Sequence, residues 1–327
     1  MLVILAPGQG AQTAGFLRPW LDDPIFAARL EWLGAVAGLD LAHYGTDADD
    51  ETIRDTKIAQ PLLVATAILT ALELFPSSGD DPSDGLAAVG AVAGHSVGEI
   101  GAAAFAGVLS PERAMVLVRE RGNAMAAASA VTPTGMTAVL GGDRDEVLAT
   151  IDKHGLTAAN DNGPGQIVAA GTMEQLAAFA EEPPPKAKLR PLSVAGAFHS
   201  AHMAPAVDHV TRLSGAVPVH DARTAFISNA DGTVVRDGRE VLTKIVGQIA
   251  RPVRWDLCLE TMTDLGVTGI LELPPSGTLA GIAKRYFRGG PQPVETLALG
   301  GPDQLDAARE FCAKHGATPT GDEGGAA

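Results

Sequence analysis

The chain has 327 residues, 46% of them hydrophobic and only 4% aromatic, which suits one large domain or a domain with an insert. Its formal net charge of −15 argues against nucleic acid or an anionic membrane as the main partner. Cys258 and Cys312 have no metal-like spacing, so we expect a reducing compartment, no metal and no bound cofactor. No leader is evident and no run is long enough for a membrane span, so a cytoplasmic protein is expected.

Short apolar runs alternate with longer helical patterns, which is typical of an α/β fold. We predict strands at 2–5, 89–93, 225–228 and 268–273. Helices are predicted at 58–74, with Pro61 in the first turn, and at 111–128, with Ser110 as the N-cap and Pro111 in the first helical position.

The middle of the chain has a different pattern of elements. Strands and helices are predicted there in the order strand, helix, strand, strand, helix, strand, at 136–140, 144–154, 156–160, 166–170, 173–181 and 187–192. This order predicts a ferredoxin-like subdomain over residues 129–193. It would be inserted into a large α/β-hydrolase-like domain formed by 1–128 and 194–317, with a disordered tail at 318–327.

Residues 94–98 read Gly-His-Ser-Val-Gly and match a nucleophile elbow, in which a serine occupies a sharp turn between a strand and a helix. The apolar run before the motif can end a strand, and the run after it can begin a helix. We therefore interpret Ser96 as a nucleophile. The alternative is a glycine-rich turn in which the serine only caps a helix.

A nucleophilic serine needs a base, and His199 is the best of the eight histidines because it follows a small apolar run and opens a helix. His95 is expected to point away from the site, and the others lie in polar or helical surface contexts. Acyl chemistry also needs oxyanion donors. The N–H of Val97 is one, and the loop at 7–12 offers another, although an ordinary tight turn is the alternative there.

Five segments occur in an order that is specific when they are taken together. They are Gly8–Gln12, Gly94–Glu99, Arg121–Met125, Ala197–Ser200 and Pro252–Trp255. Over residues 2–315 the chain resembles malonyl-CoA:acyl-carrier-protein transacylases and the acyltransferase domains of polyketide synthases.

The resemblance implies a role for each matching residue. Ser96 would accept the acyl group and His199 would be its general base. The backbone carbonyl of Gln248 would orient the histidine in place of a carboxylate. The backbone N–H groups of Gln9 and Val97 would bind the oxyanion.

Three further residues are implied to bind substrate. Arg121 would pair with the free carboxylate of a malonyl group, which a planar guanidinium can hold through two hydrogen bonds. Asn160 belongs to a polar loop near the acyl and pantetheine entrance, where simple turn chemistry is the alternative. Phe198 matches the malonyl-using type, whereas Gly196 and the stretch 273–277 depart from the family pattern.

The implied activity is transfer of malonyl from CoA to the phosphopantetheine thiol of an acyl carrier protein through an acyl-serine, for fatty-acid or polyketide synthesis. A serine hydrolase and a non-catalytic carrier-binding module are the alternatives. We expect a monomer. Because the carrier protein is acidic, it should dock on a local basic surface of this chain. The candidate residues for that surface are Lys186, Lys188, Arg190, Arg251, Lys284 and Arg285, and the alternative is that they are ordinary surface charges.

Overall fold

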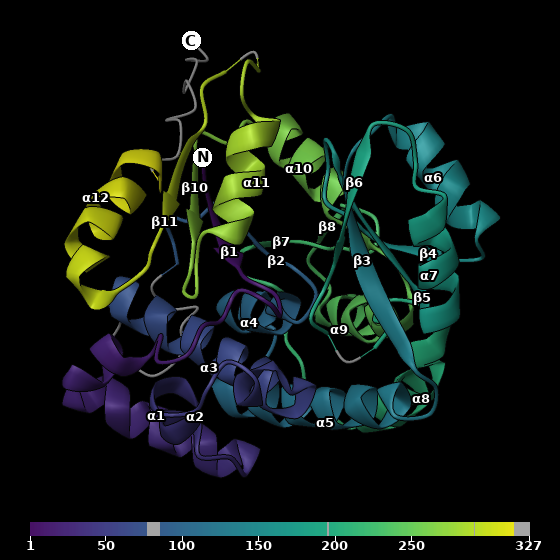
Figure 1. Cartoon of the computed structure of the whole chain (residues 1–327). Helices are drawn as coiled ribbons and strands as arrows, with labels where there is room; N and C mark the ends of the chain where they lie inside the picture. The colour runs from purple at the N-terminus through teal and green to yellow at the C-terminus, as the bar shows by residue number, and fades with distance from the viewer. Residues whose placement is uncertain (77–85, 195, 291, 317–327) are drawn as a thin grey trace.

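The computed structural model describes residues 1–76, 86–194, 196–290 and 292–316. The predicted tail at 318–327 lies outside these residues. The described chain forms two sheets with helices packed around them (Figure 1). This confirms the predicted fold class, a large α/β unit with a smaller one beside it.

The first sheet has the strand order β11-β10-β1-β2-β7-β8, and all neighbours are parallel except the last pair. Its central strands are fully buried, as expected for parallel strands covered on both faces. The strands are β1 Leu2–Ala6, β2 Ala91–Gly94, β7 Ala225–Ile227, β8 Val234–Val235, β10 Gly269–Glu272 and β11 Glu295–Ala298.

Side chains of β1 alternate between two hydrophobic clusters on opposite faces of this sheet. Leu2, Ile4 and Ala6 belong to one cluster, and Val3 and Leu5 to the other. Helices cover both faces. They are α1 Pro24–Ala37, α2 Leu41–Thr46, α3 Thr56–Leu74, α4 Gly98–Phe105, α5 Pro111–Ser129, α8 Ala204–Ser214, α9 Gly238–Gly247, α10 Trp255–Asp264, α11 Thr278–Tyr286 and α12 Leu305–Gly316.

Helix α3 begins earlier than the sequence pattern predicted. Asp55 caps it by accepting a hydrogen bond from the N–H of Lys57, so Pro61 lies in the second turn and not the first. Contrary to the expectation that no run is long enough, α3 is long and apolar enough to cross a membrane. However, 83% of its most apolar window is buried inside the protein, as in a core helix.

The second sheet has the order β6-β3-β5-β4-β9. Its first four strands are antiparallel to their neighbours and follow the ferredoxin-like order. The fifth comes from outside the predicted subdomain, because β9 pairs in parallel with β4. The exact domain boundaries stay a prediction. The elements are β3 Thr134–Gly141, α6 Arg144–Lys153, β4 Thr157–Asp161, β5 Gln166–Thr172, α7 Met173–Glu181, β6 Ala187–Pro191 and β9 Val253–Arg254.

A partly exposed ion-pair network lies at the junction between β4 and the first unit. Arg144 donates twice to Asp161, at 3.0 and 2.7 Å, and Arg254 donates twice to Asp256, at 2.8 and 2.6 Å. Arg144 also lies 3.8 Å from Asp256, which links the two pairs. This network links the end of β4, at Asp161, to the first turn of α10, at Asp256.

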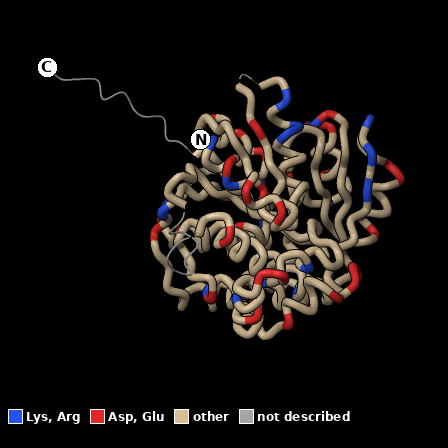
Figure 2. Tube along the Cα trace, turned by 90° about the vertical axis from the view of Figure 1, so that its left-hand side faces the viewer, with Lys and Arg blue, Asp and Glu red and all other residues tan. Residues whose placement is uncertain are grey.

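Asp and Glu are scattered along the chain trace in the view of Figure 2, and the chain has 39 of them against 24 Lys and Arg. Lys188 and Arg190 are exposed on β6, which is an edge strand. Edge lysines and arginines also discourage strand pairing between molecules. Their role in docking a partner therefore stays a prediction.

Candidate active site

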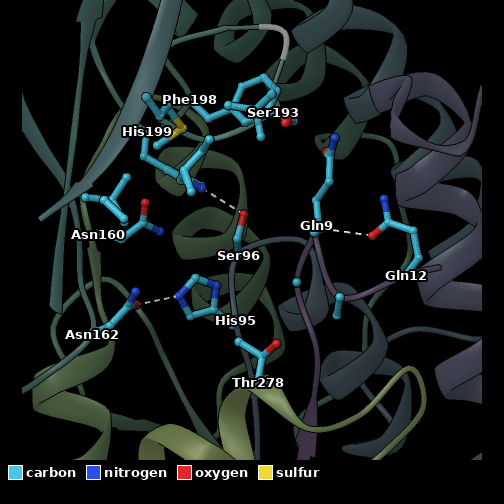
Figure 3. Close-up of a pocket in the computed structure, with 18 of the residues that line it drawn as sticks. Gln9, Gln12, His95, Ser96, Asn160, Asn162, Ser193, Phe198, His199 and Thr278 are labelled. Atoms are coloured by element: carbon cyan, nitrogen blue, oxygen red, sulfur yellow. Dashed lines mark hydrogen bonds between the residues drawn. The ribbon is translucent and has the colours of Figure 1, made fainter. Parts of the chain in front are cut away.

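A pocket of about 500 Å³ lies between the two sheets, beyond the carboxyl ends of β1 and β2 (Figure 3). Ligands of open parallel sheets typically bind at this end of the strands. One wall comes from the loop after β1 and the turn after β2. The other comes from β3, β4 and β5 of the second sheet, through Met136, Ala138, Asn160, Gln166 and Val168.

The turn after β2 is a strained elbow, as the motif predicted. Ser96 has a φ of +53°, a conformation that is uncommon for residues other than glycine. A Cβ on Gly94 would lie 2.0 Å from the carbonyl carbon of Gly98, and one on Gly98 would lie 2.3 Å from the carbonyl oxygen of Ala6. Both glycines are therefore needed because the strand, the turn and α4 approach too closely for a side chain.

His199 lies against the elbow serine. Its Nε2 is 2.8 Å from Ser96 Oγ, and its Nδ1 is 2.7 Å from the backbone carbonyl oxygen of Gln248. A carbonyl can only accept, so Nδ1 carries the proton and Nε2 is free to accept the serine proton. Burial, and then the charge of Arg121, lower the pKa of His199 to about 3. The imidazole is therefore neutral and can act as a base.

The elbow also contains one N–H group that binds no protein acceptor within the described residues, that of Val97. The N–H groups of His95, Ser96 and Gly98 donate to Ala6, Asn229 and His95. Within the described residues, no protein acceptor is bound by the N–H of Val97 or of Gln9. The Gln9 loop lines the same pocket, and Gly10 N–H is held by Gln12 at 2.8 Å.

Arg121 lies behind the pocket wall and is only 1% exposed. Its Nη1 donates to Gln60 Oε1 at 2.7 Å, and its Nη2 donates to Gln248 Oε1 at 3.1 Å and to Ser96 Oγ at 3.4 Å. Nε has no partner, and no carboxylate in the described chain lies within ion-pair distance. Burial lowers the pKa of Arg121 to about 10, against the charge of Glu99. The residue is thus a buried cation without a direct counter-ion.

Asn160 and Phe198 both line the pocket and are 6% exposed. Gly196, which departs from the family pattern, has a packing reason, because a Cβ there would lie 2.2 Å from Ser129 Oγ. Asn160 and Phe198 therefore lie in the same pocket as Ser96. Their contacts with a substrate stay a prediction.

The expectation for His95 was wrong. Its ring lines the pocket beside Ser96, and its Nε2 is 2.9 Å from Asn162 Oδ1. The ring also packs edge-on against Trp255, at 5.6 Å between centroids. Space for it exists because a Cβ on Gly8 would come within 3.0 Å of the His95 ring. His315, expected at the surface, is likewise buried, at 7% exposed.

Sequence reasoning assigned no role to three buried polar residues: Glu99 and Asn229, which support the elbow, and Gln60, which holds Arg121. Asn229 accepts from Ser96 N–H at 2.8 Å and donates to the Gly94 carbonyl at 2.7 Å. Glu99 accepts from Asn229 N–H at 2.6 Å and from Gln248 Nε2 at 2.5 Å. Glu99 follows the motif directly and could have been noticed, whereas Gln60 and Asn229 carry no local signal.

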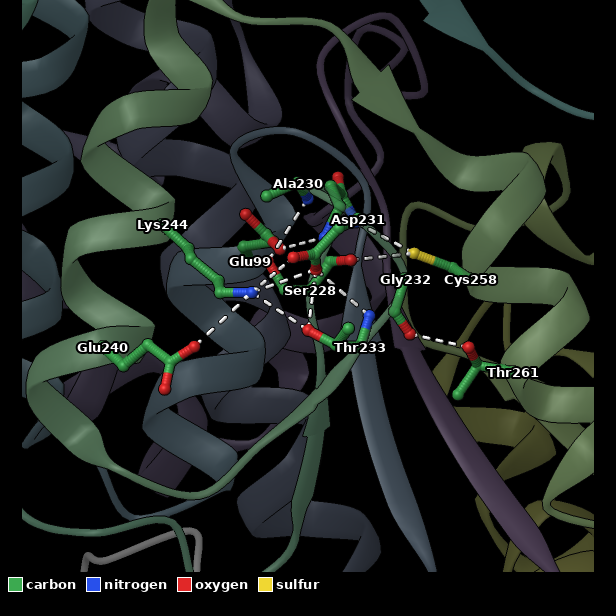
Figure 4. Close-up of polar contacts among 11 residues, drawn as sticks. Glu99, Ser228, Ala230, Asp231, Gly232, Thr233, Glu240, Lys244, Cys258 and Thr261 are labelled. Carbon is green, nitrogen blue, oxygen red and sulfur yellow. Dashed lines mark hydrogen bonds and ion pairs between the residues drawn. The ribbon is translucent and has the colours of Figure 1, made fainter.

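Glu99 is fully buried next to the loop at 228–233 (Figure 4). Lys244 holds the far side of this loop through Asp231, at 2.7 Å. Burial raises the pKa of Glu99 to about 8, against the hydrogen bond from Asn229 and the charges of Arg121 and Lys244.

A serine on an elbow, hydrogen-bonded to a neutral histidine in a pocket, is the arrangement of enzymes that form acyl-serine intermediates. A family model described as an acyl transferase domain matches residues 3–318. The chain therefore belongs to the acyl transferase domain family and is an acyltransferase.

Named relatives cover nearly the whole chain. Malonyl CoA-acyl carrier protein transacylase of Mycobacterium tuberculosis (strain H37Rv) is 46% identical over 306 residues, 94% of this chain and 98% of that protein. The Bacillus subtilis (strain 168) protein of the same name is 32% identical over 316 residues, 94% and 96% of the two chains.

Solved structures agree with these relatives. The crystal structure of MCAT from Mycobacterium tuberculosis matches with a TM-score of 0.87 at 45% identity, over 94% of this chain and 99% of that one. A malonyl-transacylase solved in complex with its type II PKS acyl-carrier protein matches with a TM-score of 0.83 at 26% identity, over 94% and 99%.

Proposed function

We propose that this chain transfers malonyl from malonyl-CoA to the phosphopantetheine thiol of an acyl carrier protein. The observation that carries the proposal is the buried, carboxylate-free Arg121, whose Nη2 lies 3.4 Å from the Oγ of Ser96. A cation so close to the nucleophile favours an acyl group with a free carboxylate, as malonyl has and acetyl lacks. The names of the relatives point to the same substrate and carrier.

The first half of the reaction would load the serine. His199 Nε2 removes the proton of Ser96, and Oγ attacks the thioester carbonyl carbon of malonyl-CoA. The oxyanion that forms is bound by the N–H groups of Gln9 and Val97. The carbon–sulfur bond then breaks, the CoA thiolate takes the proton from His199, and malonyl remains on Ser96 as an ester.

The second half reverses these steps with a different thiol. The carrier's pantetheine thiol gives its proton to His199 and attacks the ester, and Ser96 leaves with that proton. Two half-reactions that share one covalent intermediate make a ping-pong scheme. A neutral His199, held by the Gln248 carbonyl, serves in both directions because it alternates between base and acid.

The test is the covalent intermediate itself. Wild-type protein incubated with malonyl-CoA should gain the mass of one malonyl group, and Ser96→Ala should gain none. Addition of holo carrier protein should remove the adduct and produce malonyl-carrier. Loss of the adduct to water at the same rate with and without carrier would instead indicate a hydrolase, and an adduct on Ser96→Ala would refute the assigned nucleophile.

A further inference from the structure

Gln248 contacts three parts of the site through three different atoms. Its backbone carbonyl accepts from His199, its side-chain Oε1 accepts from Arg121, and its Nε2 donates to Glu99. We propose that the Gln248 side chain, oriented by Glu99, is a positioning residue that holds Arg121 ready for the acyl carboxylate. This role is separate from that of the backbone carbonyl, and it rests on the proposed function.

The orientation of the Gln248 amide follows from its neighbours. The Arg121 guanidinium offers only donors, so the amide presents Oε1 to it, and Nε2 donates to Glu99 on the other side. A flipped amide would face N–H against N–H on the arginine side. Gln248 and Arg121 are each 1% exposed and Glu99 is 0% exposed, so little water can relieve such a clash. Arg121 and Glu99 together therefore hold the amide with Oε1 towards the arginine.

The partners of Arg121 explain why an amide is suited to this position. Two neutral oxygens, from Gln60 and Gln248, each hold one Nη group. They fix the plane of the guanidinium without neutralising it, whereas a carboxylate at either position would form an internal ion pair. An internal pair would compete with the carboxylate of the substrate. The amides thus keep the cation both ordered and available.

Glu99 lies one amide away from the cation and makes no direct ion pair with it. Gln248 Nε2 also lies 3.3 Å from the Ser96 carbonyl and 3.3 Å from Asn229 Oδ1. The series of hydrogen bonds from Glu99 through Gln248 to Arg121 therefore starts in the first turn of α4, the helix that follows Ser96. The elbow and the carboxylate-binding residue are held by one continuous set of hydrogen bonds.

The experiment compares two acyl groups on a variant that keeps the backbone carbonyl. Gln248→Met replaces the amide with an unbranched apolar chain of similar length. The rate of acyl-serine formation is measured by rapid-quench mass spectrometry with malonyl-CoA and with acetyl-CoA. We expect malonyl loading to fall about 10- to 100-fold, as for a lost hydrogen bond to a charged group, and acetyl loading to change less than about threefold.

Labelling of Ser96 by a neutral organophosphonate reports on the serine and histidine without a carboxylate, and malonyl loading should fall by a larger factor than this labelling rate. Gln248→Glu, which keeps the shape of the side chain, should also lower malonyl loading more than acetyl loading, because its carboxylate can pair with Arg121. It supplies the same comparison should Gln248→Met not fold.

Equal losses for the two acyl groups, or unchanged malonyl loading in both variants, would overturn the inference. Absence of a malonyl adduct on the wild type would remove the proposed function and this inference with it. Failure of the proposed function is distinguishable from failure of this inference, because the missing malonyl adduct is already visible in the wild-type protein.

Discussion

Asn229 offers the sharpest test of how the elbow is held. Its side-chain amide bonds both ends of the turn, the Ser96 N–H at 2.8 Å and the Gly94 carbonyl at 2.7 Å. Asn229 is fully buried, so no solvent replaces these bonds in Asn229→Ala. We expect this variant to lose both stability and the rate of acyl-serine formation.

The magnitude follows from the two backbone groups left without partners. Each buried, unsatisfied polar group costs about 1–3 kcal/mol, so the pair should cost about 2–6 kcal/mol of unfolding free energy. This is a large share of the roughly 5–15 kcal/mol that stabilises a typical domain. In addition, Ser96 at its φ of +53° loses a restraint, so its Oγ should spend less time within reach of His199 Nε2.

Urea unfolding and the initial rate of malonyl-serine formation provide the two readouts. Thr261→Val is the matched control, because Thr261 Oγ1 donates to the Gly232 carbonyl at 2.6 Å and so tethers the same loop away from the elbow. The control should lose stability and keep its acylation rate once folded. Asn229→Ala with wild-type stability and rate, or with an acylation loss no larger than that of the control, would refute the reasoning.

Two further predictions concern charge in the pocket. Arg121→Ala should lower kcat/KM for malonyl-CoA by at least about 100-fold and kcat/KM for acetyl-CoA far less, because only malonyl loses a charge-assisted pair. Equal losses for the two substrates would contradict the carboxylate role of Arg121. Because the pKa of His199 is lowered to about 3, the acylation rate should show no decline centred near pH 6.5. The contribution of His199 to the unfolding free energy should decrease as pH falls below 6.5, because the unfolded chain then binds a proton that folded His199 does not. Glu99, with its pKa raised to about 8, contributes with the opposite sign as pH falls below 8, so the comparison is made between the wild type and His199→Gln. An acylation rate that declines with a midpoint at pH 6–7 would contradict the lowered pKa of His199.

The parallel strands were predictable because strands buried on both faces read as short apolar runs, as β1 and β10 do. The ferredoxin-like order was likewise readable from alternating patterns at 136–192. Strand β9 was not, because two residues carry no periodicity and only their pairing with β4 makes them a strand. The start of α3 was missed because its cap, Asp55, precedes the apolar pattern.

At the site, sequence patterns indicated residues that act through short motifs, such as Ser96. They could not indicate the partners that these motifs acquire by folding. Asn229 lies 133 residues from Ser96, and its neighbourhood, Asn229–Gly232, has the composition of an ordinary turn. His95 was misplaced for a related reason. Its direction depends on the space left by Gly8, which no local pattern of residues 94–98 reveals.

The buried network also bears on how selection and catalysis can be separated. Glu99 accepts hydrogen bonds from both Asn229 and Gln248, so changing it disturbs the elbow and the arginine together. The side chain of Gln248 reaches Arg121, while its backbone carbonyl reaches His199, so substitution there removes one function and retains the other. Position 248 is therefore the place where acyl preference should change without loss of the serine–histidine pair. Position 99 should not permit this separation, because Glu99 also accepts from Asn229, which in turn holds the Ser96 N–H.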